Sequence, residues 1–351
     1  MRILNRYLFK SIAGPTALVL LVLLSLSGFV SFIAELHDVG EGDYTLYLAA
    51  KYALLKLPRL ASSLMPVSVL LGSLLGLGAL ASSSELIVMR SAGVSIYRLA
   101  KSVALAGFVL AIVGGVISEY MAPQLDLYAR QMKAIAKSKS VDITDSSAWL
   151  RNGDLIFNIR PSLDGREFGG VYTFRFGSSG GLTGIGRGDT AEEESGWSIS
   201  NYQESQMGAG GVTIATEFDN EKLVSLKDLL SITAVRQSSL TAAELWSYVQ
   251  YLKSNGLKSD TYEIAFWNRV SAVFGILIMA MLALPFATGS LRSAGMGARM
   301  VIGALIGLGY FLLTQTLADS VAVFSLSPIL VAWFPTILLS MVVWIGLRRA
   351  R

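Results

Sequence analysis

Six charge-poor apolar runs alternate along the chain with short polar connections and one long polar stretch. A bilayer core of roughly 30 Å needs about 20 apolar residues in one helix. Six runs reach or approach that length: Ile12 to Ala34, Leu60 to Ser84, Ser102 to Ser118, Val270 to Leu291, Met300 to Ala318 and Ser320 to Leu347. The pattern predicts six transmembrane helices, three before the long polar stretch and three after it.

The first run follows a basic N-terminal segment, as the apolar core of a cleaved signal peptide would. It is longer than the usual signal-peptide core of about 7–15 residues, and Phe32 interrupts the small-residue pattern expected before a cleavage site. We therefore expect a retained membrane helix.

The second run is rich in small residues, with Gly72 and Gly76 four positions apart. This spacing lets two membrane helices approach each other closely. Because the spacing is common in membrane helices, a specific partner for this one stays open.

The long polar stretch, residues 141–240, has the two-residue period of half-buried strands in segments such as "DLIFNIRPS", "VYTFRF" and "WSISNY". Glycine-rich turns such as "FGSSGG" and "MGAGG" separate these segments. Short strands joined by glycine turns predict a compact antiparallel sandwich or jelly roll. The alternation leaves open whether Phe157 and Ile159, or Tyr172, Phe174 and Phe176, lie on the inward face.

Residues 241–262 are predicted to form a connecting amphipathic helix after the β-domain. One face of this helix carries Leu245, Tyr248, Val249 and Leu252, and Gly256 would end it. The expected fold is thus an α-helical membrane protein of six transmembrane helices with an inserted all-β, jellyroll-like domain. Its expected parts are residues 1–140 with the first three spans, 141–240 with the β-domain, 241–262 with the connecting helix, and 263–351 with the last three spans.

Composition and charge agree with a membrane protein and suggest its orientation. Of 351 residues, 53% are hydrophobic and 15% are charged, and the mean hydropathy is +0.55; a soluble domain has about 25% charged residues. Cations accumulate in short cytoplasmic segments. If the N-terminus is cytoplasmic, the cytoplasmic segments contain a single acid, Glu85. They also contain the following cations: Arg2, Arg6, Lys10, Arg90, Arg98, Lys101, Arg292, Arg299, Arg348, Arg349 and Arg351. We expect cytoplasmic termini and a β-domain across the membrane.

Several kinds of chemistry are excluded by residue content. The chain has no cysteine and one histidine, His37, so a thiol nucleophile or a dense catalytic metal site is not available. The phosphate-binding pattern G-x-x-x-x-G-K-[ST] is missing, so the chain does not hydrolyse ATP by that route. An intramembrane hydrolase would need a polar pair within the bundle, whereas the spans offer only Glu119 and Asp319 near their ends. We expect a protein that is not an enzyme.

A short helix is predicted near residues 83–93, between the second and third spans. Ser83 or Ser84 would cap it, and Glu85 would lie in its first turn, near the positive end of the helix dipole. The helix continues with four apolar residues, Leu86, Ile87, Val88 and Met89. Such a helix suits insertion into a groove of a cytosolic partner. A turn whose apolar side chains only touch lipid head groups is the alternative.

At this level of detail the chain resembles the LptF/LptG permeases of lipopolysaccharide export ABC transporters, and the LptG branch more closely than the LptF branch. The resemblance runs from end to end, through "SLSGF" in the first span, "SELIVMRSAG" after the second, "APQ" at the end of the third, "YVQYLKSNG" before the fourth and "LRSAGMGARM" between the fourth and fifth. The "SELxVM" element and the "LRSxxMGxR" loop together are its most specific part.

The resemblance implies a permease subunit that extracts lipopolysaccharide from the bacterial inner membrane and passes it to a periplasmic β-jellyroll bridge. It implies an LptF-like permease, an LptB-like ATPase dimer and an LptC-like single-span protein as partners, and no nucleic acid. ATP and Mg²⁺ would be bound by the ATPase, and this chain would hold no cofactor. Two other functions stay open: a permease of another lipid or lipoprotein ABC exporter, and a membrane scaffold that displays a β-domain.

By the same resemblance the helix near residues 83–93 is a coupling helix that contacts the ATPase. Its implied contact residues are Glu85, Leu86, Val88 and Met89. A helix end tied to the ATPase by a charge-assisted bond would transmit closure of the nucleotide-binding subunits as a rigid-body push.

Lipopolysaccharide carries phosphates, so its contacts should be cations at the outer end of the spans. The candidates are Lys56 and Arg59 before the second span, and Arg130 and Lys133 after "APQ". Ordinary interfacial anchoring of these long side chains is the alternative. The family pattern has basic residues where this sequence has Ser31 and Asp38, which puts the outer end of the first helix in doubt as a phosphate site.

Overall fold

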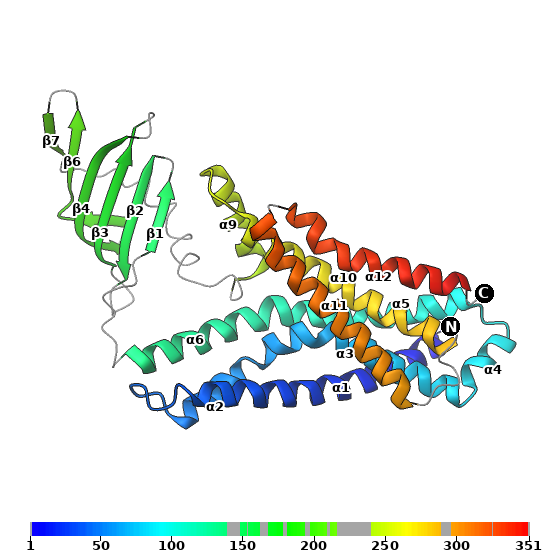
Figure 1. Ribbon diagram of the computed structural model, residues 1–351. Helices are drawn as coiled ribbons and strands as arrows, with labels where there is room; N and C mark the ends of the chain where they lie inside the picture. Colours follow the sequence, from blue (N-terminus) through cyan, green and yellow to red (C-terminus); the bar gives the residue numbers. More distant parts are fainter. Residues whose placement is uncertain are drawn as a thin grey trace. The chain divides into compact units, whose positions relative to one another are not determined.

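The computed structural model describes residues 2–138, 148–152, 154–161, 168–177, 181–193, 197–208, 211–215, 240–288, 296–324 and 326–349 (Figure 1). The chain forms two compact units. A helical unit comprises Met1–Lys137, Thr241–Trp246 and Asp260–Arg351, and a second unit, which holds the β-sheet, comprises Ser138–Leu240 and Ser247–Ser259.

The helical unit is built from ten segments: α1 (Arg2–Leu36), α2 (Leu46–Leu55), α3 (Leu57–Ser82), α4 (Glu85–Ser91), α5 (Ile96–Val116), a π-helical turn (Ile117–Met121), α6 (Ala122–Ser138), α10 (Asp260–Thr288), α11 (Met296–Phe324) and α12 (Pro328–Arg349). Within the described part of the chain, 6 of the resulting helices are long and apolar enough to cross a membrane. The prediction of three spans on each side of a β-domain is confirmed.

The third span is longer than its apolar run, because α5, the π-helical turn and α6 form one helix over Ile96–Lys137. At 1.5 Å per residue its 42 residues cover roughly 63 Å, about twice the hydrocarbon thickness. Much of α6 must therefore extend beyond the hydrocarbon. Hydropathy marks only the part of a helix that lies in lipid, so the sequence pattern missed this extension.

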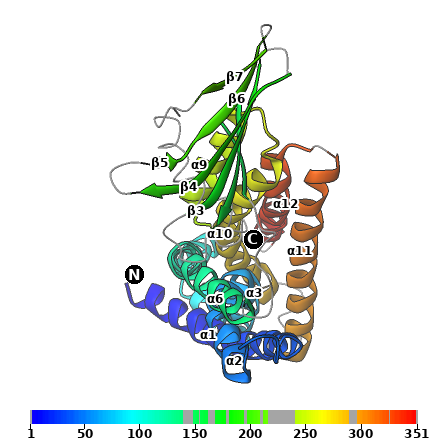
Figure 2. The same cartoon turned by 90° about the vertical axis from the view of Figure 1, so that its left-hand side faces the viewer.

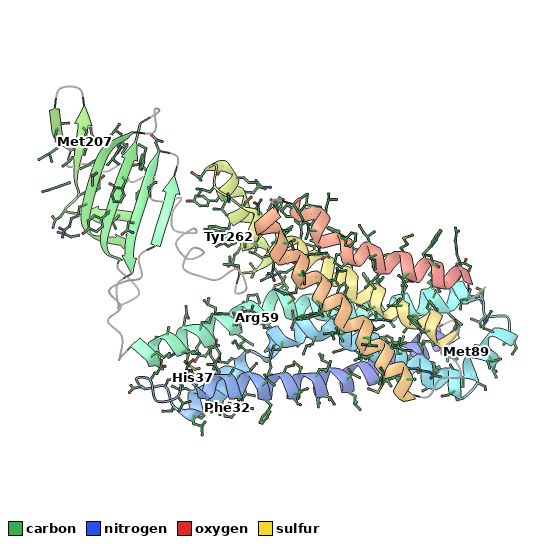
Figure 3. All side chains as sticks on the ribbon, in the orientation of Figure 1. Phe32, His37, Arg59, Met89, Met207 and Tyr262 are labelled. Carbon is green, nitrogen blue, oxygen red and sulfur yellow. The ribbon has the colours of Figure 1, made fainter. Side chains whose placement is uncertain are left out.

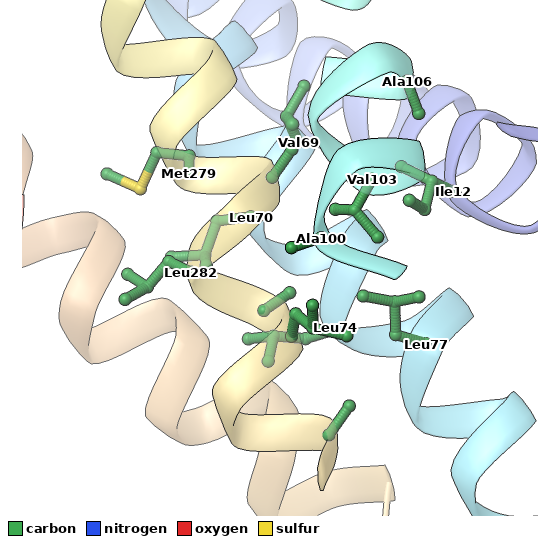
Figure 4. Packing of buried hydrophobic residues seen from close by; sticks show 14 of the residues in the cluster. Ile12, Val69, Leu70, Leu74, Leu77, Ala100, Val103, Ala106, Met279 and Leu282 are labelled. Atoms are coloured by element: carbon green, nitrogen blue, oxygen red, sulfur yellow. The ribbon is translucent and has the colours of Figure 1, made fainter. Parts of the chain in front are cut away.

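Helix α3 lies at the centre of the bundle and packs against α1, α5, α10 and α11. Its apolar side chains interlock with those of α1, α5 and α10 in one continuous core (Figure 4). Two glycines bring α3 against α1: a Cβ atom on Gly72 would lie 2.3 Å from Thr16 Oγ1, and one on Gly76 would lie 1.8 Å from the Ser11 carbonyl oxygen. The small residues that the sequence shows in this run therefore have a specific partner, the backbone of α1.

The β-unit contains one antiparallel sheet made of β1 (Ala148–Asn152), β2 (Leu155–Pro161), β3 (Phe168–Phe176), β4 (Leu182–Glu193), β5 (Trp197–Ser200), β6 (Gln203–Gly208) and β7 (Gly211–Ala215). The strand order is β1-β2-β3-β4-β6-β7 (Figure 1), and β5 pairs with β4 (Figure 2). An all-β domain between the third and fourth spans is thus confirmed, and among the described residues its strands belong to a single sheet.

The register of the strands decides which face of the sheet is inward. Phe157 pairs with Thr173 and both are buried, as is Val171 on the same face. On the opposite face Tyr172 and Phe174 are half-buried. Phe157, Val171 and Thr173 therefore lie on the more buried face of the sheet, and Tyr172 and Phe174 lie on the opposite face.

The predicted amphipathic helix after the β-domain is α9 (Ala242–Ser254). Thr241 and Glu244 form a reciprocal cap: the Glu244 carboxylate accepts from the Thr241 backbone N–H at 2.7 Å, and the Thr241 hydroxyl accepts from the Glu244 N–H at 3.3 Å. The helix is followed by Gly256 at φ +66°, and the Leu257 N–H bonds to the Leu252 carbonyl at 2.8 Å. All four predicted apolar positions are buried: Leu245, Tyr248, Val249 and Leu252.

Replacing Gly76 should loosen the crossing of α1 and α3. The added methyl of Gly76→Ala would overlap the Ser11 carbonyl, so we expect the fold to lose about 1–3 kcal/mol, the usual cost of overpacking. Thermal unfolding of the purified protein in detergent, followed by circular dichroism, measures this. Gly14→Ala on α1 is the matched control, because nothing lies within 4 Å of its Cβ position. Equal melting temperatures for the two variants would contradict the close crossing.

Candidate functional site

The bundle has two ends with different chemistry, here called the α4 end and the α2 end after the short helix at each (Figure 1). Helix α3 connects them, since α2 directly precedes it and α4 directly follows it. Both ends contain residues that the sequence singled out.

Helix α4 begins with a sharp reversal of the chain after α3. Ser84 holds the N-cap position at φ 61°, in the left-handed region, and its side chain makes no capping bond. The expected serine cap is therefore wrong, because capping requires an extended backbone at that residue. After the helix, Gly93 at φ +88° and a bond from the Val94 N–H to the Met89 carbonyl (3.0 Å) end it.

The apolar side chains of α4 divide between two directions. Leu86 is only 3% exposed and belongs to the core of the bundle, and Met89 packs against that core from the edge (Figure 3). Val88 is 64% exposed, and Ile87 is 38% exposed. Of the apolar contact residues that the resemblance implied, Leu86 and Met89 therefore anchor α4 to its own bundle, and only Val88 faces outward.

Glu85 is tied to the first helix. Its carboxylate accepts hydrogen bonds from the Tyr7 hydroxyl, at 2.5 Å, and from the Ser83 hydroxyl, at 3.0 Å. Sequence analysis missed Tyr7, because 78 positions separate it from Glu85 and no local pattern links them. The bond from Tyr7 connects the first turn of α4 to α1.

At the α2 end, two of the predicted cations share a buried acid. Arg59 Nη1 lies 3.0 Å from Asp126 Oδ2, and Arg130 Nε lies 2.9 Å from the same oxygen. Asp126 is completely buried (0% exposed), so its charge depends on both arginines for compensation. One signal for this contact is visible in the sequence: the four-residue spacing of Asp126 and Arg130 places them on one helix face.

The predicted lysines also have acidic partners. Lys133 Nζ lies 2.5 Å from Glu35 Oε2 and 2.5 Å from Asp38 Oδ2, and Lys56 Nζ lies 3.9 Å from Glu35 Oε1. Lys137 Nζ reaches Asp38 at 2.9 Å and Glu41 Oε2 at 2.7 Å. Bonds from Lys133 and Lys137 lower the pKa of Asp38 to about 2, so this carboxylate is charged at neutral pH.

We call these nine residues the α2-end ion cluster: Glu35, Asp38, Glu41, Lys56, Arg59, Asp126, Arg130, Lys133 and Lys137. Tyrosines line it. The buried Tyr44 donates to Glu35 Oε2 at 3.1 Å, and Lys133 Nζ lies 4.9 Å from the centroid of the Tyr52 ring. Burial, more than the neighbouring Glu35, raises the pKa of Tyr44, which keeps its hydroxyl a donor.

An apolar cavity of about 730 Å³ lies beside this cluster, between α1 and α2. Its lining includes Leu24, Gly28 and Phe32 of α1, and Ala53 and Leu54 of α2. Phe32 also packs against the group around Tyr44, so the apolar cavity and the ion cluster adjoin (Figure 3). The arrangement suits an amphiphile, with an acyl chain in the cavity and an anionic group at the cations.

A third polar contact, missed as a site by the sequence, lies at the π-helical turn. The Glu119 carboxylate accepts two bonds from the Ala242 backbone N–H, at 2.8 and 3.0 Å, and so holds the first turn of α9. Arg269 Nη1 lies 3.7 Å from Glu119 Oε2. The only sequence signals for this contact were two charged residues, Glu119 near the end of the third span and Arg269 at the start of the fourth.

Within the residues that the structure describes, no group of three or more His, Asp or Glu side chains is arranged to hold a metal ion. The acids of the α2-end ion cluster are instead occupied by lysines and arginines. The described side chains at the two polar ends of the bundle therefore offer charged and apolar binding surfaces.

Comparison with known proteins agrees with this geometry. The family model for the lipopolysaccharide export system permease LptF/LptG matches residues 6–349. The chain is 29% identical to LptG of Haemophilus influenzae and 30% identical to LptG of Escherichia coli K12, in each case over 99% of both chains. It is 21% identical to LptF of Escherichia coli K12, over 94% of this chain and 90% of that protein. This chain thus belongs to the LptF/LptG family of lipopolysaccharide export system permeases, and within it is more similar to these LptG proteins than to LptF.

Proposed function

We propose that this permease subunit of a lipopolysaccharide export system takes lipopolysaccharide from the inner membrane at its α2 end and is driven by an ATPase at its α4 end. The observation that carries the proposal is the apolar cavity of about 730 Å³ beside the α2-end ion cluster. Few ligands need an apolar cavity and a cluster of cations side by side, and an acylated, phosphorylated lipid is one of them. A scaffold that only displays a β-domain would need neither.

Within the cluster, the lysines are better placed than the arginines to exchange partners. Arg59 and Arg130 compensate the fully buried Asp126, and a phosphate that displaced it would leave an uncompensated charge. Lys133 and Lys137 bond to Asp38, which is 23% exposed, so an incoming phosphate can replace this carboxylate at lower cost. Lys133 and Lys137 are therefore our first choice for phosphate contact, and Lys56, at 3.9 Å from Glu35 Oε1, is the next. Arg59, which is 39% exposed, keeps further guanidinium N–H groups for a second contact.

Coupling to the ATPase is proposed for α4. Val88, with Ile87 beside it, presents an exposed apolar knob for a groove of an LptB-like ATPase, which would bind ATP and Mg²⁺. Leu86 fixes α4 to the bundle core, and Glu85 ties it to Tyr7 of α1. A push on α4 would then move α1 and α3 as a rigid body rather than bend a loop.

The remaining parts of the proposal concern partners and orientation. The family and the six apolar helices make this a multi-pass inner-membrane protein. The cations near the α4 end favour cytoplasmic termini and a periplasmic β-domain. Strand β7 is an edge of the described sheet, with exposed Val212 and Ile214, and suits strand pairing with an LptC-like protein or a jellyroll bridge. An LptF-like permease is the expected second half of the membrane complex.

Orientation can be tested with single cysteines, because the chain has none of its own. A cysteine at Ser84 should be protected from a membrane-impermeant thiol reagent in intact cells, and one at Gln203 in β6 should be labelled. Both should react after the membrane is permeabilised. Labelling of Ser84 in intact cells would reverse the orientation and remove α4 from the cytoplasm.

Charge on the outward side of α4 should weaken attachment of the ATPase. We expect Val88→Asp to lower the amount of co-purified ATPase about 10-fold or more, because it buries a charge in an apolar contact. The level of the chain itself should stay normal, since Val88 is exposed within it. Ser91→Asp adds the same charge to an exposed position of the same helix and serves as control. If both variants retain the ATPase equally, Val88 is not at the interface.

Removing the Asp38 charge should strengthen contact with lipopolysaccharide. Asp38→Asn releases Lys133 and Lys137 from one acidic partner, so we expect photocrosslinking of lipopolysaccharide at the α2 end to rise about 3-fold, a gain within the range of one exposed ion pair. Lys133→Gln should lower it. Asp38→Glu, which keeps the charge, is the control and should leave it unchanged. A fall in crosslinking with Asp38→Asn would show that Asp38 positions the lysines and does not compete for them.

A further inference from the structure

A second cavity, of about 400 Å³, lies at the α4 end and is lined by Tyr97, Trp344, Leu347 and Arg348. Tyr97 is in the first turn of α5, and the other three lie in the last turns of α12. Both helices pack against α10, and the residues that line the cavity come from both of them. It is separated from the α2-end ion cluster by the length of α3.

The cation in this cavity is held by an aromatic ring. The Arg348 guanidinium carbon lies 3.6 Å from the centroid of the Trp344 ring, one helical turn away. Among the residues that the structure describes, no carboxylate forms an ion pair with Arg348. Stacking fixes the plane of the guanidinium and leaves its in-plane N–H donors to an outside anion. In this respect Arg348 differs from the cations of the α2 end, each of which bonds to an acid.

Exposed apolar side chains continue from the cavity along both helices. On α12 they recur every three or four residues up to Trp344: Leu330, Phe334, Ile337 and Met341. On α5 they lead away from Tyr97 and the exposed Lys101: Leu105, Phe108, Ile112 and Val116. From Leu330 to Trp344 the α12 stripe covers roughly 21 Å, more than one leaflet of a core of about 30 Å.

A cation on an aromatic ring, a tyrosine, a second cation and long apolar stripes match the parts of a phospholipid. We propose that Tyr97, Lys101, Trp344 and Arg348 bind the head-group phosphate of an anionic phospholipid, whose acyl chains lie along the stripes of α5 and α12. Basic cavities between membrane helices bind such head groups elsewhere. A soluble partner is disfavoured, because the stripes lie on segments that cross the membrane. The site is distinct from the proposed lipopolysaccharide contact, which lies at the opposite end of α3.

The test measures phospholipid bound to the purified full-length chain. Delipidated protein in detergent is titrated with palmitoyl-oleoyl phosphatidylglycerol, with phosphatidylcholine of the same chains, with inorganic phosphate and with lipopolysaccharide, and bound molecules are counted by native mass spectrometry. We expect Arg348→Ala to weaken phosphatidylglycerol binding about 10-fold, as loss of a charge-assisted bond does. Trp344→Ala removes the ring that orients the Arg348 guanidinium and should weaken binding in the same direction. Arg348→Lys keeps the charge without the planar stack and should lose about 3-fold. Arg98→Ala removes an exposed arginine next to Tyr97 that does not line the cavity, and should change nothing.

Each other outcome overturns the proposal. Equal phosphatidylglycerol binding by the wild-type protein, Arg348→Ala and Trp344→Ala would place the lipid elsewhere. Binding of inorganic phosphate as tight as that of phosphatidylglycerol would indicate a free-anion site. Displacement of phosphatidylglycerol by lipopolysaccharide would make the cavity a substrate contact. Loss of a co-purified protein from Arg348→Ala with phospholipid binding unchanged would make it a protein interface. Unchanged melting temperatures of the variants separate these results from misfolding.

Discussion

The close contact between α1 and α3 is the constraint on which both ends of the bundle depend. Gly76 lets the backbone of α3 touch the Ser11 carbonyl, and α3 in turn packs against α5, α10 and α11. Because α2 precedes α3 and α4 follows it, the ion cluster and helix α4 are attached to opposite ends of one buried helix. Lipid gives no hydrophobic drive for helices to associate, so this contact depends on van der Waals packing that only small residues allow.

The charges at the α2 end show a compromise between fold and binding. Five cations face four carboxylates there, so the cluster is nearly neutral without a ligand. Pairing with acids compensates the charge of these cations, and a phosphate that bound here, as proposed above, would have to displace one of the acids. The acids differ in burial and therefore in how easily an anion could displace them. Asp126 is fully buried, whereas Asp38 and Glu41 are partly open to solvent. An anion that enters the cluster would meet the more exposed acids first.

Sequence analysis predicted the features that follow from a periodic pattern of apolar residues. It missed the contacts between residues that lie far apart in the chain. The six spans, the alternation of the β-strands and the buried face of α9 follow from hydropathy, because lipid or core acts on every turn of an element alike. The pairing of Tyr7 with Glu85 and that of Glu119 with Ala242 join residues 78 and 123 positions apart, and no local pattern encodes them. The left-handed backbone of Ser84 was missed for a related reason. A serine before a helix is usually a cap, and here the sharp turn out of α3 overrides that preference.

The length of α3 explains how a movement at one end of the protein could reach the other. Its 26 residues cover roughly 39 Å, so a rotation of about 5° around the α4 end would displace the α2 end by roughly 3 Å. That distance is as long as the bonds from Arg59 to Asp126, and a shift of this size would break the contacts that hold the ion cluster. At Gly72 and Gly76, separation of α3 from α1 would open a gap in a closely packed core, so this part of α3 resists movement away from α1. If an ATPase pushes on α4, as proposed above, the displacement would pass along these packed helices toward the ion cluster.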